Sequence, residues 1–165
     1  MKIKIMRRTA LQDLALDPFE GTVAVISITS VHNPIVALEH MPDYILRLSF
    51  DDIATDDIAD KLGPKPTEEH RKEIEEKYHM FSDEQAMKVA EFYYSVRDKV
   101  DTLICQCEYG QSRSAGVAAA IIEHTTHKGI RVFADDRYYP NKFVFRKVIN
   151  ALTEEKKKVQ DVVKK

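Results

Sequence analysis

The segment best equipped for chemistry covers residues 103–121 and reads LICQCEYGQSRSAGVAAAI. The apolar residues that end at Cys107 predict a buried strand, and the alanine-rich stretch after Ser112 predicts a buried helix. The first N–H groups of a helix lack internal partners and carry the positive end of its dipole, so a tight loop at this point binds an oxyanion. Because the same field favours a thiolate over a thiol, Cys107 is predicted to be a nucleophile at the base of an anion-binding loop.

Two further residues of the loop suit a phosphate ligand. Gly110 lets the backbone turn sharply and approach the ligand closely. Arg113 carries a planar guanidinium that matches two oxygens of a phosphate. A thiolate beneath a bound phosphate is placed to attack phosphorus, so the segment predicts nucleophilic chemistry on a phosphoester.

The sequence Cys107-Glu-Tyr-Gly-Gln-Ser-Arg113-Ser114 resembles the signature loop of the cysteine-based protein tyrosine phosphatases. It is most similar to the compact dual-specificity group, in particular to its small bacterial relatives. Two other features fit this family: an acid-bearing loop follows a strand at residues 50–53, and a Tyr-Pro-Asn segment opens the last helix at residues 139–141. The resemblance covers most of residues 20–152 and implies the fold of the family.

The resemblance also implies hydrolysis of a phosphomonoester through a phosphocysteine intermediate, without a metal or another cofactor. It implies that Cys107 is the nucleophile, that Arg113 clamps the phosphate, and that the Ser114 hydroxyl helps the thiolate to leave in the second step. An aspartate near Asp52 is then the general acid. The residues expected to surround the bound phosphate are those of the loop: Glu108, Tyr109, Gly110, Gln111, Ser112 and Arg113.

Two features of the chain differ from the family pattern. Gln106 stands where the family usually has the histidine that shapes the loop and tunes the thiol. Asp52 and Cys107 are separated by 55 positions (107 minus 52), more than in compact members. An acidic insertion at about residues 53–80 accounts for the extra length. This insertion is predicted to be either an exposed surface excursion or a mobile lid over the site.

The identity of the general acid is open among neighbouring carboxylates. Asp51 and Asp52 both follow Phe50, and neighbouring side chains diverge at a strand-to-loop turn, so one of the two is expected to face the loop. Asp52 is preferred, Asp51 comes second, and Asp56 or Asp57 remain as further candidates. A general acid must lie within hydrogen-bond reach of the leaving group, and the alternative role for these acids is a helix N-cap or a solvated charge.

Other residues whose side chains could take part in chemistry have structural explanations. Cys105 is interpreted as a core residue, because a disulfide to Cys107 on the same strand face is near the upper limit of Cα separation. His124 and His127 have a spacing that suits a metal, but no acid or thiol cluster accompanies them, and histidine is favoured near a helix C-terminus. His32 is interpreted as a turn residue beside an Asn-Pro pair.

The elements that position these residues follow from hydrophobic periodicity. Strands are predicted at residues 2–6, 22–28, 44–50 and 102–107, with a weaker candidate at 130–133. Helices are predicted to begin at Ser82 with a capping box, at Ser112 with a stop at Gly129, and near Pro140. Strands that alternate with helices predict an α/β fold whose central, mainly parallel sheet is flanked by helices.

Composition narrows the class of protein further. The chain has 165 residues, enough for a single domain over residues 1–165. Its 25 basic and 27 acidic side chains give a formal charge of −2, which argues against a strongly basic nucleic-acid-binding protein. The sequence contains no apolar run long enough to predict a membrane-spanning segment. Two cysteines cannot build a disulfide framework, so a reducing compartment and a cytoplasmic location are expected.

The predicted function is therefore that of a phosphatase for phosphorylated protein side chains, first phosphotyrosine and then phosphoserine or phosphothreonine. Glu108 in the loop is expected to repel polyanions, which favours phosphopeptides over highly phosphorylated inositol lipids. Three alternatives remain open: a catalytically silent phosphate-binding module, an RNA 5'-triphosphatase and a rhodanese-like sulfurtransferase. The sequence makes no prediction of oligomeric state.

Overall fold

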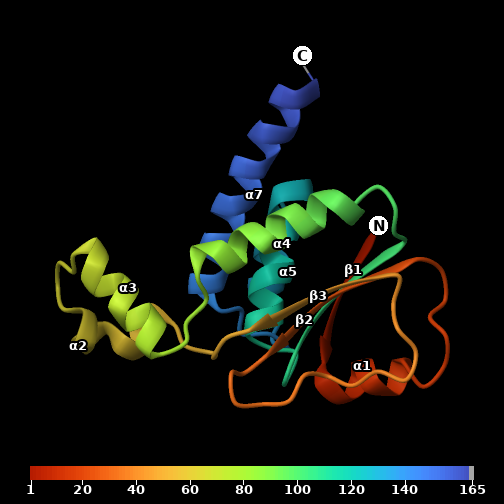
Figure 1. Cartoon of the computed structure of the whole chain (residues 1–165), viewed down its shortest axis with the longest axis horizontal. Coiled ribbons are helices and arrows are strands. Elements are labelled where there is room, and N and C mark those ends of the chain that lie inside the picture. Colours follow the sequence, from red (N-terminus) through yellow and green to blue (C-terminus); the bar gives the residue numbers. More distant parts are fainter. Residues whose placement is uncertain (164–165) are drawn as a thin grey trace.

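A central sheet of four parallel strands organises the protein (Figure 1). The computed structural model describes residues 1–163. The strands lie in the order β1-β4-β2-β3 and comprise β1 Lys2–Arg7, β2 Val23–Thr29, β3 Tyr44–Ser49 and β4 Thr102–Cys107. The central strands β2 and β4 are buried along nearly their whole length, which explains why their sequences are continuous apolar runs. The predicted α/β class with a parallel sheet is confirmed.

Helices cover both faces of the sheet (Figure 1). One face carries α4 Asp83–Val96, α5 Arg113–Thr126 and α7 Lys142–Val163, and the other carries α1 Arg8–Leu14. The shorter elements are the 3-10 helix η1 Thr55–Ile58 and the helices α2 Ala59–Leu62, α3 Glu68–Lys77 and α6 Ile130–Phe133. None of the helices within residues 1–163 combines the length and hydrophobicity that a transmembrane span requires.

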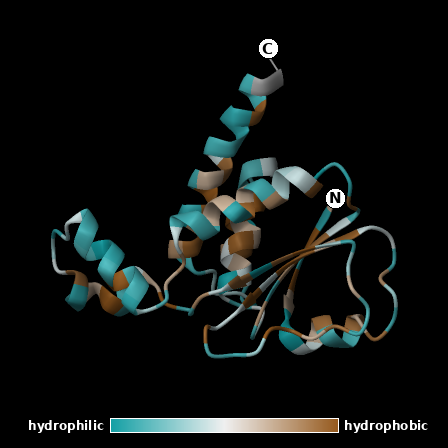
Figure 2. Ribbon diagram, viewed as in Figure 1, coloured by the Kyte–Doolittle hydropathy of each residue, from teal (hydrophilic) through white to brown (hydrophobic). Residues whose placement is uncertain are grey.

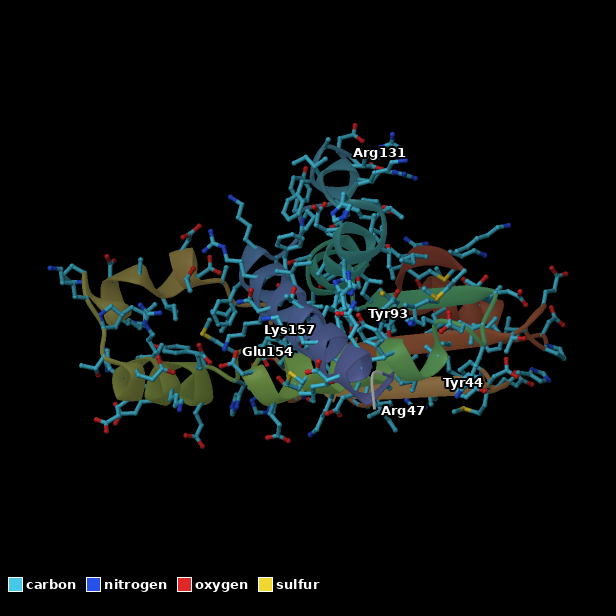
Figure 3. The ribbon with its side chains drawn as sticks, turned by 90° about the horizontal axis from the view of Figure 1, so that it is seen from above. Tyr44, Arg47, Tyr93, Arg131, Glu154 and Lys157 are labelled. Atoms are coloured by element: carbon cyan, nitrogen blue, oxygen red, sulfur yellow. The ribbon has the colours of Figure 1, made fainter. Side chains whose placement is uncertain are left out.

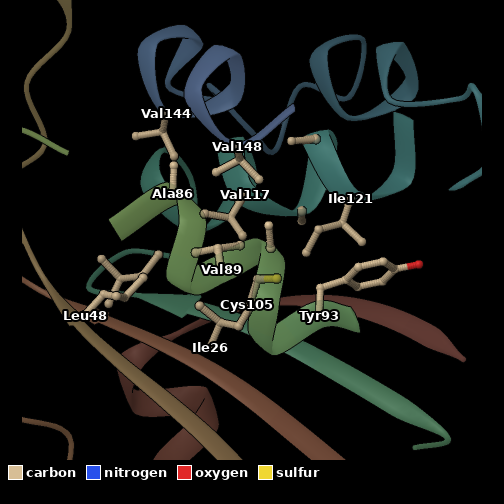
Figure 4. Close-up of a cluster of buried hydrophobic side chains, with 14 of the residues drawn as sticks. Ile26, Leu48, Ala86, Val89, Tyr93, Cys105, Val117, Ile121, Val144 and Val148 are labelled. Carbon is tan, nitrogen blue, oxygen red and sulfur yellow. The ribbon is translucent and has the colours of Figure 1, made fainter. Parts of the chain in front are cut away.

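The larger apolar core lies between the sheet and the three helices α4, α5 and α7 (Figure 4). The sheet contributes Ile26 and Cys105, α4 contributes Val89, and α5 contributes Val117, all of which are fully buried. Burial of a large aliphatic side chain stabilises a fold by about 1.5–3 kcal/mol. A smaller cluster on the opposite face consists of Leu11, Val23, Val25, Val36 and Ile104. The sheet is therefore held from both sides, which fixes the positions of its strand ends.

Two predicted helix starts are confirmed. Ser82 caps α4 in a capping box: its hydroxyl accepts from the Gln85 N–H at 3.1 Å, and the Gln85 side chain accepts from the Ser82 N–H at 3.1 Å. Asn141 caps α7, because its Oδ1 accepts from the N–H groups of Phe143 and Val144 at 3.0 and 3.1 Å. These local hydrogen bonds satisfy amides that the helix itself leaves free.

Two predictions near the end of α5 are wrong. The helix does not stop at Gly129, because His127 takes the left-handed C-cap position with a φ of 56°. The backbone N–H of Gly129 instead donates to a Glu123 carboxylate oxygen at 2.8 Å. Residues 130–133 form α6 rather than a strand, since Val132 is buried in a cluster against α5. An apolar run of four residues fits either a strand or a helical turn, and tertiary packing decided between them.

Residues 53–80 project from the sheet and the main helices as a separate surface unit (Figure 3). The outward side of α3 is largely hydrophilic (Figure 2). Lys147 of α7 anchors the unit, because its Nζ lies 2.8 Å from a Glu75 carboxylate oxygen and 3.0 Å from one of Asp83 on α4. The base of this charge-rich unit is thus tied to α7 by ion pairs.

Candidate active site

The carboxyl ends of the four parallel strands meet at one edge of the sheet, where ligands bind in open α/β folds. Cys107 is the last residue of β4, and Asp52 lies in the loop after β3. Arg8 follows β1 directly, and Ser30 follows β2. The strand order therefore brings four segments that are distant in sequence to the same edge.

The amides and the carbonyls of the loop between β4 and α5 differ in their hydrogen bonding. Within residues 1–163, the amides of residues 109–112 donate no hydrogen bond. Three carbonyls of this loop accept from other segments: Glu108 from Arg8 N, Gln111 from Tyr139 N, and Ser112 from Asn141 N. The Ser112 carbonyl also accepts the first hydrogen bond of α5, from Gly116 N. Consecutive free amides at a helix N-terminus form a concave site for an anion.

Cys107 lies at the base of this loop. Its side chain is buried, and its Sγ is 3.1 Å from Ser114 Oγ, which is within hydrogen-bond distance. Ser114 belongs to the first turn of α5, so the helix itself fixes the hydroxyl beside the sulfur. Cys107 and Ser114 therefore lie side by side where β4 ends and α5 begins.

Gly110 gives the loop its tight shape. Its φ is +67°, a left-handed conformation that other residues adopt only with strain. A Cβ at this position would lie 2.5 Å from the backbone nitrogen of Arg7. The anion loop therefore packs directly on the end of β1, and only glycine allows this contact.

Arg113 is held rigidly beneath the mouth of the loop. It is 3% exposed, and its Nη1 donates to Ser30 Oγ at 3.0 Å and to the Phe50 carbonyl at 2.8 Å. Its Nε is buried and has no hydrogen-bond partner among the described residues. This nitrogen is 3.9 Å from Asp52 Oδ2. An orphan donor on a buried guanidinium is costly unless a ligand satisfies it, which indicates an oxyanion site.

We expect Arg113→Lys to lower kcat/KM for an aryl phosphate by about 10²-fold, because a point charge cannot reproduce the fixed planar fork. Steady-state kinetics of the purified variant measure the loss, and thermal unfolding shows whether the variant is folded. A folded variant within a few-fold of wild type would show that Arg113 does not clamp the phosphate.

Asp52 lies across the mouth of the loop. Its Oδ1 accepts from Ser112 Oγ at 2.7 Å and from Asn141 Nδ2 at 3.0 Å, so Oδ2 is the oxygen without such a donor. The side chain of Asp51 turns away and accepts from the Val31 N–H at 3.2 Å. Of the two neighbouring carboxylates, the structure therefore brings only Asp52 to the loop.

Asn141 is a site residue that the sequence reasoning missed. One end of its amide caps α7, and its Nδ2 holds Asp52 and also donates to the Ile53 carbonyl at 3.3 Å. The sequence predicted the Tyr-Pro-Asn segment as a helix start that fits the family layout, without a role for the Asn141 side chain. A helix cap uses only the side-chain oxygen, so both N–H donors of the amide remain for other partners, and this was the available signal.

Arg8 is a second residue that the sequence reasoning missed. Its Nη1 is 3.1 Å from a Glu108 carboxylate oxygen, and its Nη2 donates to the carbonyls of Pro34 and Ile35 at 2.7 and 3.2 Å. Because Arg8 neutralises Glu108, the repulsion of polyanions expected from this carboxylate is weakened. Arg8 thereby ties the anion loop to the segment after β2.

We expect Arg8→Met to lower kcat/KM for an aryl phosphate by about tenfold. Without Arg8 the anion loop is displaced slightly, and such a displacement misplaces the reacting atoms. Arg7→Met is the matched control, because Arg7 is exposed and its side chain forms no hydrogen bond or ion pair within residues 1–163. Kinetics and thermal unfolding of both variants provide the test. Equal losses in the two variants would contradict a positioning role for Arg8.

Gln106 is fully buried on the face of β4 opposite Cys107. Its Oε1 accepts from Ser27 Oγ at 2.8 Å, while its Nε2 has no partner among the described residues. We expect Gln106→His to change the pH profile of Cys107 alkylation by iodoacetamide, because the imidazole alters the hydrogen bonds behind the loop. Superimposable profiles for wild type and variant would mean that position 106 serves packing alone.

The remaining chemically interesting residues have structural positions. Cys105 is in the core, where burial, and to a lesser extent the nearby Cys107, raises the pKa of its thiol to about 12. His124 Nε2 lies 2.8 Å from the Tyr94 hydroxyl, and burial lowers the pKa of this imidazole. His32 lies in a turn and contacts the ring of His79 edge-on. Residues 1–163 contain no cluster of three or more His, Cys, Asp or Glu side chains suited to a metal ion.

The fold, in which a Cys-x5-Arg loop joins the central strand β4 to helix α5, is similar to that of solved protein tyrosine phosphatase structures. Two crystal structures of PTPMT1, a dual-specificity-like protein tyrosine phosphatase, share the fold. The structure of PTPMT1 in complex with PI(5)P aligns with a TM-score of 0.54 at 14% identity, over 96% of this chain and 94% of that chain. The other PTPMT1 structure gives 0.52 at 14% identity, over 97% and 95%. No protein-family model and no curated protein matches the sequence.

Proposed function

We propose that the protein hydrolyses phosphomonoesters, and that phosphotyrosine in peptides or proteins is its preferred substrate. One observation carries the proposal: the buried Cys107 thiol adjoins a loop with four consecutive free amides, and the orphan Nε of Arg113 lies beside that loop. Phosphate oxygens satisfy both kinds of donor. The same arrangement gives a sulfur nucleophile a defined approach to phosphorus.

In the first step of the proposed reaction, the Cys107 thiolate attacks phosphorus. The bond between phosphorus and the ester oxygen breaks, and its electron pair goes to that oxygen. Asp52 donates a proton to the oxygen as it leaves, through the Oδ2 that neither Ser112 nor Asn141 holds. Arg113 and the free amides stabilise the charge on the phosphoryl oxygens.

In the second step, water attacks the phosphocysteine and Asp52 takes a proton from that water. The sulfur–phosphorus bond breaks, and the sulfur leaves as a thiolate. Ser114 Oγ, 3.1 Å from Sγ, donates a hydrogen bond to the developing negative charge. Inorganic phosphate is the product, and the enzyme returns to its starting state.

The choice of phosphotyrosine is supported by the surroundings of the loop. Tyr109 and Tyr139 are 77% and 72% exposed, and the backbone of Tyr139 is bonded to Gln111 in the loop. Aromatic side chains next to the site suit contact with a planar phenyl ester. Because PTPMT1 has been crystallised with PI(5)P, this lipid is the natural competing substrate to test.

A substrate panel tests the proposal. Purified protein is assayed with para-nitrophenyl phosphate, a phosphotyrosine peptide, the matched phosphoserine peptide and PI(5)P in mixed micelles. We expect release of inorganic phosphate, with the highest kcat/KM among the physiological esters for the phosphotyrosine peptide. A higher kcat/KM for PI(5)P would overturn the substrate class but not the chemistry. Binding of phosphopeptide without turnover of any ester would instead identify a silent phosphate-binding module.

A further inference from the structure

Two adjoining pockets extend from Asp52 toward the projecting unit of residues 53–80. The first has a volume of about 400 Å³ and shares Asp52, Ser112 and Asn141 with the candidate active site. The second has a volume of about 290 Å³. Thr55, Asp56 and Phe143 line both pockets, so the second pocket adjoins the one that contains the proposed general acid.

The two pockets differ in chemical character. Besides Asp52 and Asp56, the wall of the first carries Asp57, Lys142 and Arg146, so carboxylates and cations face the same space. The second has more apolar than polar surface: Ile58, Ala59, Leu62, Pro66, Met80 and Phe143 supply its apolar wall, and Arg71 and Glu75 are charged residues of the same lining. A ligand that extends from the first pocket into the second therefore meets a polar stretch first and a more apolar region second.

We propose that the second pocket is a specificity subsite, which binds one apolar side chain of the phosphopeptide whose phosphorylated residue occupies the anion loop. This inference rests on the proposed function and adds a sequence preference to it. A peptide backbone carries the N–H and C=O groups that a polar passage requires, and it delivers an apolar side chain beyond that passage. The volume of the second pocket suits a leucine-sized or phenylalanine-sized group.

The charges of the first pocket favour a peptide over an inositol lipid. Three carboxylates, those of Asp52, Asp56 and Asp57, oppose the two cations Lys142 and Arg146. A lining with more carboxylates than cations repels a second phosphate and accommodates a neutral polypeptide backbone. The apolar subsite is therefore assigned to a protein substrate. The test below includes the inositol lipid as the competing ligand.

A leucine scan of the substrate tests the subsite. A phosphotyrosine peptide with serine at every other position is compared with peptides that carry one leucine at successive positions on either side. We expect one position to raise kcat/KM about tenfold, since filling an apolar pocket has effects of this size. Hydrolysis of para-nitrophenyl phosphate measures the catalytic activity separately from the subsite, because this small ester does not reach the second pocket.

Two variants connect that preference to the pocket. Ala59→Phe fills the subsite and should reduce the ratio of kcat/KM for the leucine and serine peptides to about one. Asp60→Phe is the matched control, because it adds the same ring to the next, exposed residue of α2, which does not line the pocket. The ratio should remain about ten in this control.

Three outcomes would overturn the proposal: no leucine position is preferred, Ala59→Phe lowers all substrates by one factor, or Ala59→Phe selectively impairs PI(5)P in mixed micelles. If wild type hydrolyses no ester at all, the proposed function has failed and the subsite is tested by fluorescence anisotropy of the two labelled peptides. About tenfold tighter binding of the leucine peptide, lost in Ala59→Phe alone, supports the subsite. Equal affinities refute it.

Discussion

Cys107→Ser is expected to abolish turnover, with a loss of at least about 10⁴-fold in kcat for para-nitrophenyl phosphate. The serine hydroxyl is a far weaker nucleophile than a thiolate in this field, whereas the free amides of the loop and Arg113 are unchanged. The variant should therefore still bind orthophosphate and phosphopeptide. Initial rates and equilibrium binding, measured on the same preparation, separate the two effects.

Cys105→Ser is the matched control for this substitution. Cys105 is two positions earlier on the same strand and is fully buried in the core. Its variant should lose some stability because a hydroxyl replaces a buried thiol, but it should keep the chemistry. If Cys107→Ser retains turnover, or if Cys105→Ser is the inactive variant, the nucleophile has been assigned wrongly.

Asp52→Asn is expected to lower kcat by about 10²- to 10⁴-fold for a phosphotyrosine peptide. Negative charge develops on the leaving oxygen, and the amide cannot donate an acidic proton to it. A nitrophenol leaving group needs little protonation, so the loss with para-nitrophenyl phosphate should be much smaller. The ratio of the two losses is the diagnostic measurement, because a general defect in folding or binding would affect both substrates alike.

Asp51→Asn separates the two neighbouring acids. The Asp51 side chain accepts from the Val31 N–H and does not contact the anion loop. This variant should show no dependence on the leaving group, although the loop after β2 is expected to be less well held. A leaving-group effect in Asp51→Asn, and none in Asp52→Asn, would transfer the role of general acid to Asp51.

The sequence by itself determined the parts of this protein that depend on local interactions. The anion loop between Cys107 and Arg113 was predictable, because a buried strand, a glycine turn and a helix N-terminus follow one another within a short segment. The buried central strands and the capping box at Ser82 were predictable for the same reason. Helix α1 was not predicted: it has no side-chain cap, and its formation is explained by the burial of Leu11 against the sheet.

Only the tertiary structure decided which polar residues complete the site. The sequence only ranks Asp52 ahead of its neighbour Asp51, whereas the hydrogen bonds from Ser112 and Asn141 to Asp52 distinguish the two. Arg8 likewise meets Glu108 across the ends of β1 and β4. These contacts join positions 60, 89 and 100 residues apart. They arise from the order of strands in the sheet, which brings distant strand ends to one edge, and no local pattern encodes that order.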